Sequence, residues 1–420
     1  MKPIDMKSIS FVDQDVQECP YEAYELLREE APVWQDPGTG FYVITKYKDL
    51  KYILNDHEVF SKDLSGEFDE GIEGIGSFWR HPKEAEAIFE KEGWAEDSPL
   101  VSSPPLHTKY RKVIDPAFRQ SYIREMEPHI KTLINSLIDR WIDNGEIEFV
   151  NQFCEPLPIH VMMNRLGFPI EDFDRIKAWS EDQIAKMGQS NTLEEDLACA
   201  HRLVAFQHYL AEKFEEKRKS PKDDIMTLLV TAQLDEGREL NMQELISITM
   251  TLNVGGNETT SNAIATAMKI LMEQPETLAQ LQADPALIKP FIEEVVRLDS
   301  PAQSLLRIVR KDCELQGVSI PKGAIIDLRF ASANHDVDEF KCPADVDLHR
   351  RNPGKHMGYG SGAHHCVGAP LARQEMLLSL EILLKRLTNI QLAPGKNDFT
   401  HHPNFAVRGL KHLHLTFEKA

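Results

Sequence analysis

One cysteine in this sequence lies inside a glycine-rich loop, residues 356–368. The loop places Gly358, Gly360, Gly362 and Gly368 around Cys366. Glycines at this density allow backbone angles that other residues avoid, and they let the chain approach a flat ligand closely. A helical spacing of apolar residues begins at Leu371, so Cys366 lies where a tight loop enters a helix. Because a helix N-terminus favours a thiolate, we expect a lowered pKa for Cys366 and a sulfur that can bind iron.

A second candidate site lies in the middle of a long apolar helix. The capping pattern from Asn241 predicts where this helix begins and Pro275 predicts where it stops, a length of about 50 Å. Gly255-Gly256 lies in mid-helix, where each glycine lowers the stability of the helix by about 1 kcal/mol relative to Ala. Polar residues follow directly, among them Glu258 and Thr259, which are able to carry protons. Such a break in a central element favours a functional site, and a glycine pair that packs against another helix is the alternative.

Two basic residues share one face of a predicted helix near residue 107. His107 and Arg111 are four residues apart, after the cap candidate Ser103 and two prolines. Two donors at this spacing can clamp a carboxylate. A solvated basic face is the alternative.

Residues 359–368, Tyr-Gly-Ser-Gly-Ala-His-His-Cys-Val-Gly, resemble the heme loop of the cytochrome P450 family, Phe-Gly-x-Gly-x-His-x-Cys-x-Gly. Every fixed position matches except the first, where Tyr359 replaces Phe. Residues 255–259 are similar to the family's Ala/Gly-Gly-x-Asp/Glu-Thr, and His107 with Arg111 to its His-x-x-x-Arg pair. Glu294 and Arg297, a weak signal alone, match its Glu-x-x-Arg pair. The resemblance covers roughly residues 20–417.

The resemblance implies a mainly α fold with small β-sheets, in which a long central helix lies over heme b. One heme domain would span residues 1–420, and Cys366 would be the iron ligand. Arg350 would complete a structural ion network with Glu294 and Arg297. The other residues that would contact the heme, four of them through its propionates, are His107, Arg111, Arg307, His364, Tyr359, Gly360 and Gly368.

The implied activity is that of a monooxygenase, with Glu258 and Thr259 delivering protons on the side of the heme opposite Cys366. A heme-thiolate peroxygenase would use peroxide directly and would not need this acid–threonine pair. A heme sensor or carrier would share Cys366 without needing the pair. If the match to the heme loop is a coincidence, the chain would be an unrelated helical protein.

Electrons would come from outside the chain, because no strand is followed by a G-x-G-x-x-G nucleotide fingerprint. The resemblance implies a ferredoxin and a ferredoxin reductase as partners. An acidic ferredoxin would need a local positive patch, and Lys109, Lys112 and Arg119 are the candidates. The segments expected to face substrate, residues 64–106, 166–190, 304–306 and 404–407, indicate a small apolar ligand.

Composition limits the other partners. With 47 Lys and Arg against 67 Asp and Glu, the formal net charge is −20, which argues against nucleic acid and anionic membranes. The N-terminal residues lack an apolar stretch, and 18 apolar residues never run together, so we expect a cytoplasmic protein outside the membrane. The 6 cysteines form no C-x-x-C pair, which excludes an obvious zinc site and makes a disulfide framework unexpected.

The remaining pattern predicts the elements that position these residues. Helices are expected at 21–30 and 47–55 and through most of 124–234, and a strand at 41–45. Residues 64–100 are expected to be irregular. A hairpin is expected to turn at residues 321–323, and a small β region at 405–417.

Overall fold

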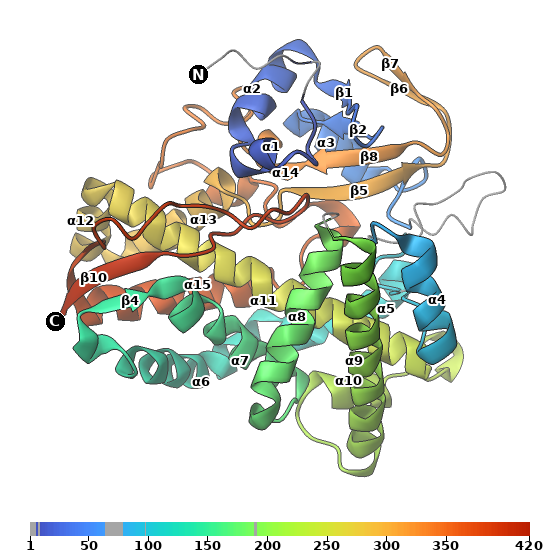
Figure 1. Cartoon of the computed structure of the whole chain (residues 1–420), viewed down its shortest axis with the longest axis horizontal. Coiled ribbons are helices and arrows are strands. Elements are labelled where there is room, and N and C mark those ends of the chain that lie inside the picture. Colours follow the sequence, from blue (N-terminus) through green and yellow to red (C-terminus); the bar gives the residue numbers. More distant parts are fainter. Residues whose placement is uncertain (1–5, 7–8, 64–78, 97, 189–190) are drawn as a thin grey trace.

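The computed structural model of the chain describes residues 6, 9–63, 79–96, 98–188 and 191–420. Helices dominate this part of the chain (Figure 1). The α-helices are α1 (Gln14–Glu18), α2 (Tyr21–Glu30), α3 (Tyr47–Asn55), α4 (Pro82–Glu92), α5 (Leu106–Ile114), α6 (Gln120–Asp139), α7 (Pro156–Leu166), α8 (Phe173–Met187), α9 (Leu193–Lys219), α10 (Ile225–Thr231), α11 (Met242–Glu273), α12 (Pro275–Ala283), α13 (Ile288–Leu298), α14 (Phe330–Ala333) and α15 (Ala369–Arg386).

The strands form three small sheets. They are β1 (Val33–Gln35), β2 (Tyr42–Ile44), β3 (Phe60–Ser61), β4 (Glu146–Glu148), β5 (Ser304–Val309), β6 (Cys313–Leu315), β7 (Val318–Ile320), β8 (Ile325–Arg329), β9 (Leu387–Leu392) and β10 (His414–Lys419). The orders are β1-β2-β8-β5-β3, β4-β10-β9 and β6-β7. The largest sheet lies with α2 and α3 at one end of the molecule, and most of the helices lie in the rest, with the β4-β10-β9 sheet at their edge (Figure 1).

The expected hairpin at residues 321–323 is wrong. β7 pairs with β6 across Gln316 and Gly317, whose φ angles of 52° and 77° are those of a tight turn. β8 instead pairs with β5 and β2 in the large sheet. The Pro-Lys-Gly segment is therefore a connection between two sheets, and Gln316-Gly317 is the turn that the sequence analysis missed.

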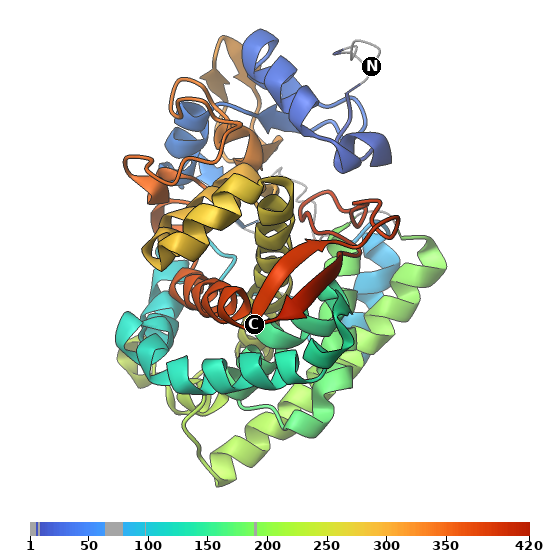
Figure 2. The same ribbon diagram turned by 90° about the vertical axis from the view of Figure 1, so that its left-hand side faces the viewer.

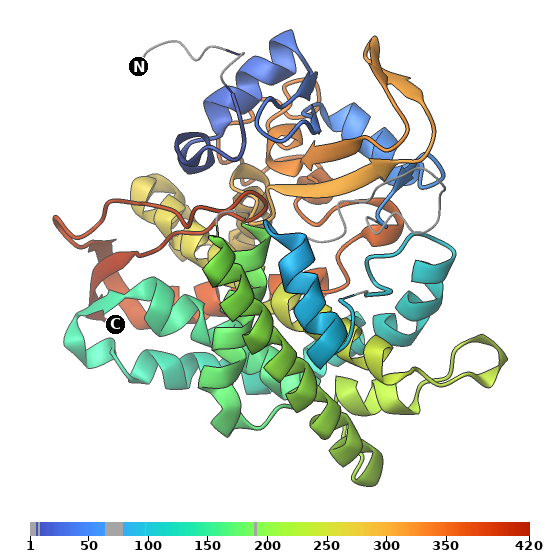
Figure 3. The same ribbon diagram turned by 45° about the vertical axis from the view of Figure 1, so that its right-hand side comes forward.

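The helix α11 runs through the middle of the helical region, and α8 and α9 cross in front of it (Figure 3). Its first turn has the predicted capping box, in which Asn241 accepts a bond from the Glu244 amide and the Glu244 side chain accepts one from the Asn241 amide. The helix continues without interruption to Glu273, and most of its residues are buried. Its far side packs against α15 and α13, the elements that carry the loop around Cys366 and the Glu-x-x-Arg pair (Figure 2).

The predicted ion network is present between α13 and the segment before the glycine loop. The Glu294 carboxylate accepts two bonds from Arg297 (2.8 and 2.9 Å) and two from Arg350 (2.8 and 3.1 Å). Both Glu294 and Arg297 are completely buried, and Arg297 also donates to the carbonyls of Asn334, Pro343 and Asp345. Because the buried charges of this network are hydrogen-bonded to one another and to backbone carbonyls, the network holds in place the chain segment that leads into the glycine loop.

Two local predictions need correction. Residues 82–92 are the helix α4, which packs on α9, although the segment 64–100 was expected to be irregular; residues 64–78 and 97 lie outside the described residues. Ser103 does not cap α5, whose N-cap position is Pro105; its hydroxyl contacts Ser61 instead. No helix in the described segments is both long and apolar enough to cross a membrane.

Candidate functional site

The glycine loop holds Cys366 through backbone contacts. The amide of Cys366 donates to the carbonyl of Tyr359 (2.9 Å), and α15 begins three residues later with Gly368 at its N-cap. Gly360 and Gly362 both have φ of 69°, in the left-handed region. A Cβ on Gly362 would also come within 2.7 Å of the Leu54 carbonyl. The sequence therefore predicted this loop-to-helix junction correctly.

The predicted lowering of the Cys366 pKa is wrong for the protein alone. Burial raises the pKa of Cys366, and the amides of Gly368 and Ala369 with the cations of Arg111 and Arg373 oppose this only in part. The Cys366 side chain is accessible to solvent, yet the protein around its sulfur desolvates a thiolate. Sequence spacing reveals the helix N-terminus but not this enclosure. A metal cation coordinated to the sulfur would reverse the balance, since a coordinating thiol loses its proton.

A hydrogen-bonded network that the sequence analysis missed supports the other side of the loop. The Arg373 guanidinium lies 4.2 Å from the centre of the Tyr359 ring and donates to Glu293 at 2.6 and 2.9 Å. His356 contacts the same carboxylate at 3.0 Å. Burial alone would raise the pKa of Glu293, but its bonds with Arg373 and His356 lower the pKa to about 2. In the sequence, the only sign of this network is the second acidic residue, Glu293, directly before Glu294.

Several basic groups converge near the glycine loop, and among the described residues His107, Arg307 and His364 form no ion pair with a carboxylate. The rings of His107 and His364 are 3.9 Å apart, and both ring nitrogens of His364 are buried without a hydrogen-bond partner among the described residues. Arg307 on β5 is 3% exposed, and its guanidinium donates to the Leu306 carbonyl (2.7 Å). Burial lowers the pKa of Arg307 to about 10, and that of His107 to about 4 with help from neighbouring cations. This cluster therefore favours an anion between its members.

Arg111 lies at the edge of this cluster with partners of its own. Its Nε donates to Asp115 (2.6 Å), and its Nη1 donates to the carbonyl of His365 (3.0 Å). The residue thus links α5 to the glycine loop directly. His107 is buried one turn earlier on the same face, so the expected pairing of the two residues on one helix face is present.

The two mid-helix glycines of α11 have different surroundings. A Cβ on Gly256 would lie 2.6 Å from Met162 of α7, so this glycine allows two helices to pack closely. A Cβ on Gly255 would have no neighbour within 4 Å. The packing interpretation therefore describes Gly256, whereas Gly255 opens onto free space beside the helix.

Most of the accessible residues in the middle of α11 follow one stripe. Thr251, Val254, Gly255, Glu258 and Thr259 retain exposure there, as does Gly256, on a helix that is otherwise mostly buried away from its ends. Their spacing of three or four residues places them on a single face. The Thr259 hydroxyl donates to the Gly255 carbonyl (3.0 Å), which leaves the hydroxyl oxygen free to accept a bond from another molecule.

Glu258 has an unusual acidity for a surface-reaching carboxyl. Burial, reinforced by the nearby Glu155, raises the pKa of Glu258 to about 7, while the nearby Asn262 side chain and the charge of Lys177 act in the opposite direction. Lys177 itself pairs with Glu155 at 3.2 Å. A carboxyl with this pKa can both take up and release protons near neutral pH.

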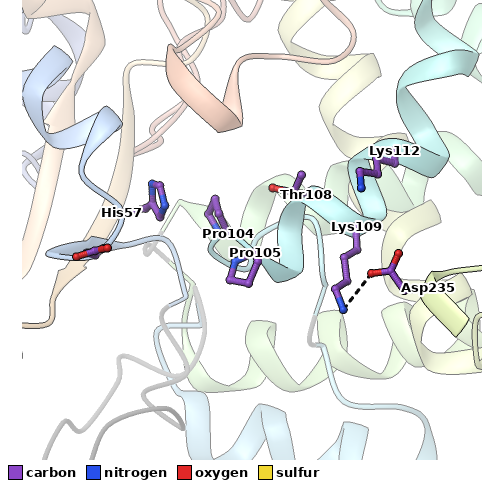
Figure 4. Close-up of a pocket in the computed structure, with 8 residues that line it drawn as sticks. His57, Pro104, Pro105, Thr108, Lys109, Lys112 and Asp235 are labelled. Atoms are coloured by element: carbon purple, nitrogen blue, oxygen red, sulfur yellow. Dashed lines mark ion pairs between the residues drawn. The ribbon is translucent and has the colours of Figure 1, made fainter.

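A surface hollow of about 580 Å³ lies on the outer face of α5 (Figure 4). Lys109 and Lys112 line it together with Pro104, Pro105 and residues of two neighbouring loops. Lys109 forms an ion pair with Asp235 (3.3 Å), shown as the dashed line. None of the residues predicted to contact heme or to carry protons lines this hollow, which is therefore separate from the site around Cys366.

Comparison with known proteins agrees with this geometry. The family model described as Cytochrome P450 matches residues 191–409. The "Putative cytochrome P450 YjiB" of Bacillus subtilis is 32% identical over 398 residues, 93% of this chain and 92% of that protein. The "Cytochrome P450 monooxygenase PikC" of Streptomyces venezuelae is 29% identical over 97% of this chain and 93% of its own length. The structure of cytochrome P450 CYP109Q5 from Chondromyces apiculatus matches with a TM-score of 0.83 and 29% identity, covering 99% of this chain and 100% of that one.

The site and fold define an oxidoreductase that incorporates oxygen into its substrate. The chain belongs to the cytochrome P450 family, and the predicted family, mainly α fold and monooxygenase class are confirmed. Members of this family bind heme iron.

Proposed function

We propose that this chain, as a single heme domain over residues 1–420, binds heme b through Cys366 and hydroxylates or oxidatively demethylates a small apolar molecule. The observation that carries the proposal is the arrangement of Cys366 just before α15, with a basic cluster next to its loop and with α15 packed against α11, the helix that carries Glu258 and Thr259. Heme bound there supplies oxygen activation, and the thiolate ligand favours O–O cleavage. The residues of the chain supply binding, orientation and protons.

The residues present fit this cofactor. Heme b would require a protein ligand for its iron and partners for its two carboxylates, and the chain offers the accessible Cys366 beside Arg307 and His364, which have no acidic partner among the described residues. His107, Arg307 and His364 would bind the carboxylates, and Arg111 would add its charge at the edge of the cluster. Tyr359, Gly360 and Gly368 would contact the ring from the loop side, where glycines permit close approach.

Glu258 and Thr259 fit the role of proton carriers. The Thr259 hydroxyl has a fixed orientation through its bond with Gly255, so its oxygen can accept a hydrogen bond from a proton-bearing partner. Glu258, with a pKa of about 7, can exchange protons with solvent. A peroxygenase would gain nothing from this pair, and neither would a heme sensor.

The electron donor that we propose is a ferredoxin, reduced by its own reductase. Of the three residues expected to form a docking patch, Lys109 is already paired with Asp235. Lys112 and Arg119 are exposed, and among the described residues neither has an ion-pair partner. We therefore propose that ferredoxin docks on Lys112 and Arg119 and not on Lys109.

The substrate class follows from the apolar segments and is supported by relatives. One structure of CYP109E1 from Bacillus megaterium contains corticosterone, and another contains testosterone. A relative from Pseudonocardia autotrophica is named a vitamin D(3) 25-hydroxylase. Steroids and related apolar compounds are the first to screen, by the spectral shift that accompanies displacement of water from heme iron.

The test of the reaction class is turnover of a spectrally active compound with NADH, ferredoxin and ferredoxin reductase. We expect oxygenated product that depends on all three, and a much slower reaction when hydrogen peroxide replaces them. Faster turnover with peroxide would identify a peroxygenase, and heme binding without product under either condition would favour a sensor or carrier.

A further inference from the structure

Lys62, which lies outside every motif of the sequence, directs its charge into the basic cluster beside the glycine loop. It directly follows β3, whose residues Phe60 and Ser61 pair with Val309 and Ile308 of β5. Extending this antiparallel register by one residue places Lys62 opposite Arg307. Side chains at opposed positions of an antiparallel pair lie on the same face, so the two cations are neighbours.

A second contact fixes Lys62 relative to the histidines. The amide of Lys62 donates to the hydroxyl of Ser103 (3.1 Å), and that hydroxyl also contacts Ser61 (2.8 Å). The carbonyl of Ser103 in turn accepts the amide of His107 (3.2 Å). Lys62 and His107 are therefore both hydrogen-bonded to the same residue, Ser103.

The surroundings of Lys62 are unfavourable for a cation in the protein alone. Burial, followed by the charges of Arg307 and Arg111, lowers the pKa of Lys62 to about 7. Among the described residues no carboxylate forms an ion pair with Lys62 or with Arg307, whose pKa is lowered by burial alone. Like charges in opposed positions destabilise a sheet unless an anion lies between them.

We propose that Lys62 is a propionate-binding residue of the heme site, and that it clamps one carboxylate together with Arg307. This inference rests on the proposed function, because the anion is the carboxylate of the heme. It also accounts for Arg111, whose Nε and Nη1 are engaged with Asp115 and with the loop carbonyl at His365. In this chain Lys62 supplies the second charge at the propionate, and Arg111 mainly braces the loop.

The test compares Lys62→Gln with Lys51→Gln, a control that removes an exposed lysine of α3. The rate of heme transfer from the ferric holoprotein to apomyoglobin should rise about 10- to 100-fold in Lys62→Gln, the range expected for losing one charge-assisted hydrogen bond. The ferric/ferrous potential should become more negative, because a positive charge near the iron stabilises the reduced form. Lys51→Gln should match the parent in both measurements.

Resonance Raman spectra of the propionate bending bands give a readout that a purely structural role would not change. These bands should shift in Lys62→Gln and also in Lys62→Arg, which retains the charge with a different geometry. Lys62→Arg should restore slow heme loss, and it replaces Lys62→Gln if that variant yields too little holoprotein. Unchanged bands and heme loss in a variant with a normal thiolate spectrum would overturn the role of Lys62 alone. A parent protein without that spectrum would overturn the proposed function itself.

Discussion

At the scale of single residues, the acidity of Glu258 gives a pH prediction. Its carboxyl is protonated below a pKa of about 7 and ionised above it, so a donor role is lost as the pH rises through 7. We expect turnover of the parent to fall above about pH 7, and we expect this limb to be absent in Glu258→Gln, which turns over more slowly at every pH. Steady-state product formation from pH 5.5 to 8.5, at saturating ferredoxin, measures both profiles. Identical profiles would mean that another group carries the proton.

The sequence predicted which residues form the site where a motif specified them. It did not predict the pKa values of those residues. The loop position of Cys366 follows from spacing, whereas the pairing of Glu294 with Arg297, a weak signal alone, was predicted from the resemblance to the family. The raised pKa of Cys366 and the charge environment of Lys62 depend on neighbours from distant segments, so sequence spacing could not reveal them. The network of Glu293, Arg373 and His356 was missed for the same reason.

At the scale of elements, the glycine pair of α11 makes opposite predictions for two adjacent positions. Gly255→Ala meets no neighbour and should stabilise the helix by about 1 kcal/mol through its higher propensity. Gly256→Ala places its Cβ against Met162 and should cost about 1–3 kcal/mol by overpacking. Chemical denaturation of the two holoproteins gives the comparison. Equal effects at both positions would show that α7 does not pack at Gly256 as described.

Element boundaries were predicted best where end signals were strong. The capping box at Asn241 and Pro275 bracket α11 as expected. The helix α4 was missed because its acidic sequence has a weak apolar stripe, and its packing on α9 is a tertiary contact. The strand pairing of β8 was missed because its partners, β2 and β5, include a strand nearly 300 residues away.

At the scale of the whole molecule, a chain with a net charge of −20 must meet an acidic electron donor through a local positive surface. Lys112→Glu and Arg119→Glu should slow reduction by ferredoxin, about tenfold at low ionic strength, and should weaken its salt dependence. Lys219→Glu, at the end of α9, is the matched control for the change in net charge. Stopped-flow reduction at several salt concentrations measures the rates. If the control slows reduction equally, net charge and not a docking patch governs the encounter.

The measurement that tests the central claim most directly is the absorption spectrum of the dithionite-reduced protein under carbon monoxide. We predict the red-shifted Soret band of a thiolate-ligated heme in the parent and in Cys154→Ala, Cys199→Ala, Cys313→Ser and Cys342→Ser. Cys366→Ala and Cys366→His should each lose this band, because the thiolate ligand is removed while the basic cluster remains. A Cys366 variant that retains the band, or a parent that binds heme without showing it, would contradict the assignment of Cys366 as the iron ligand.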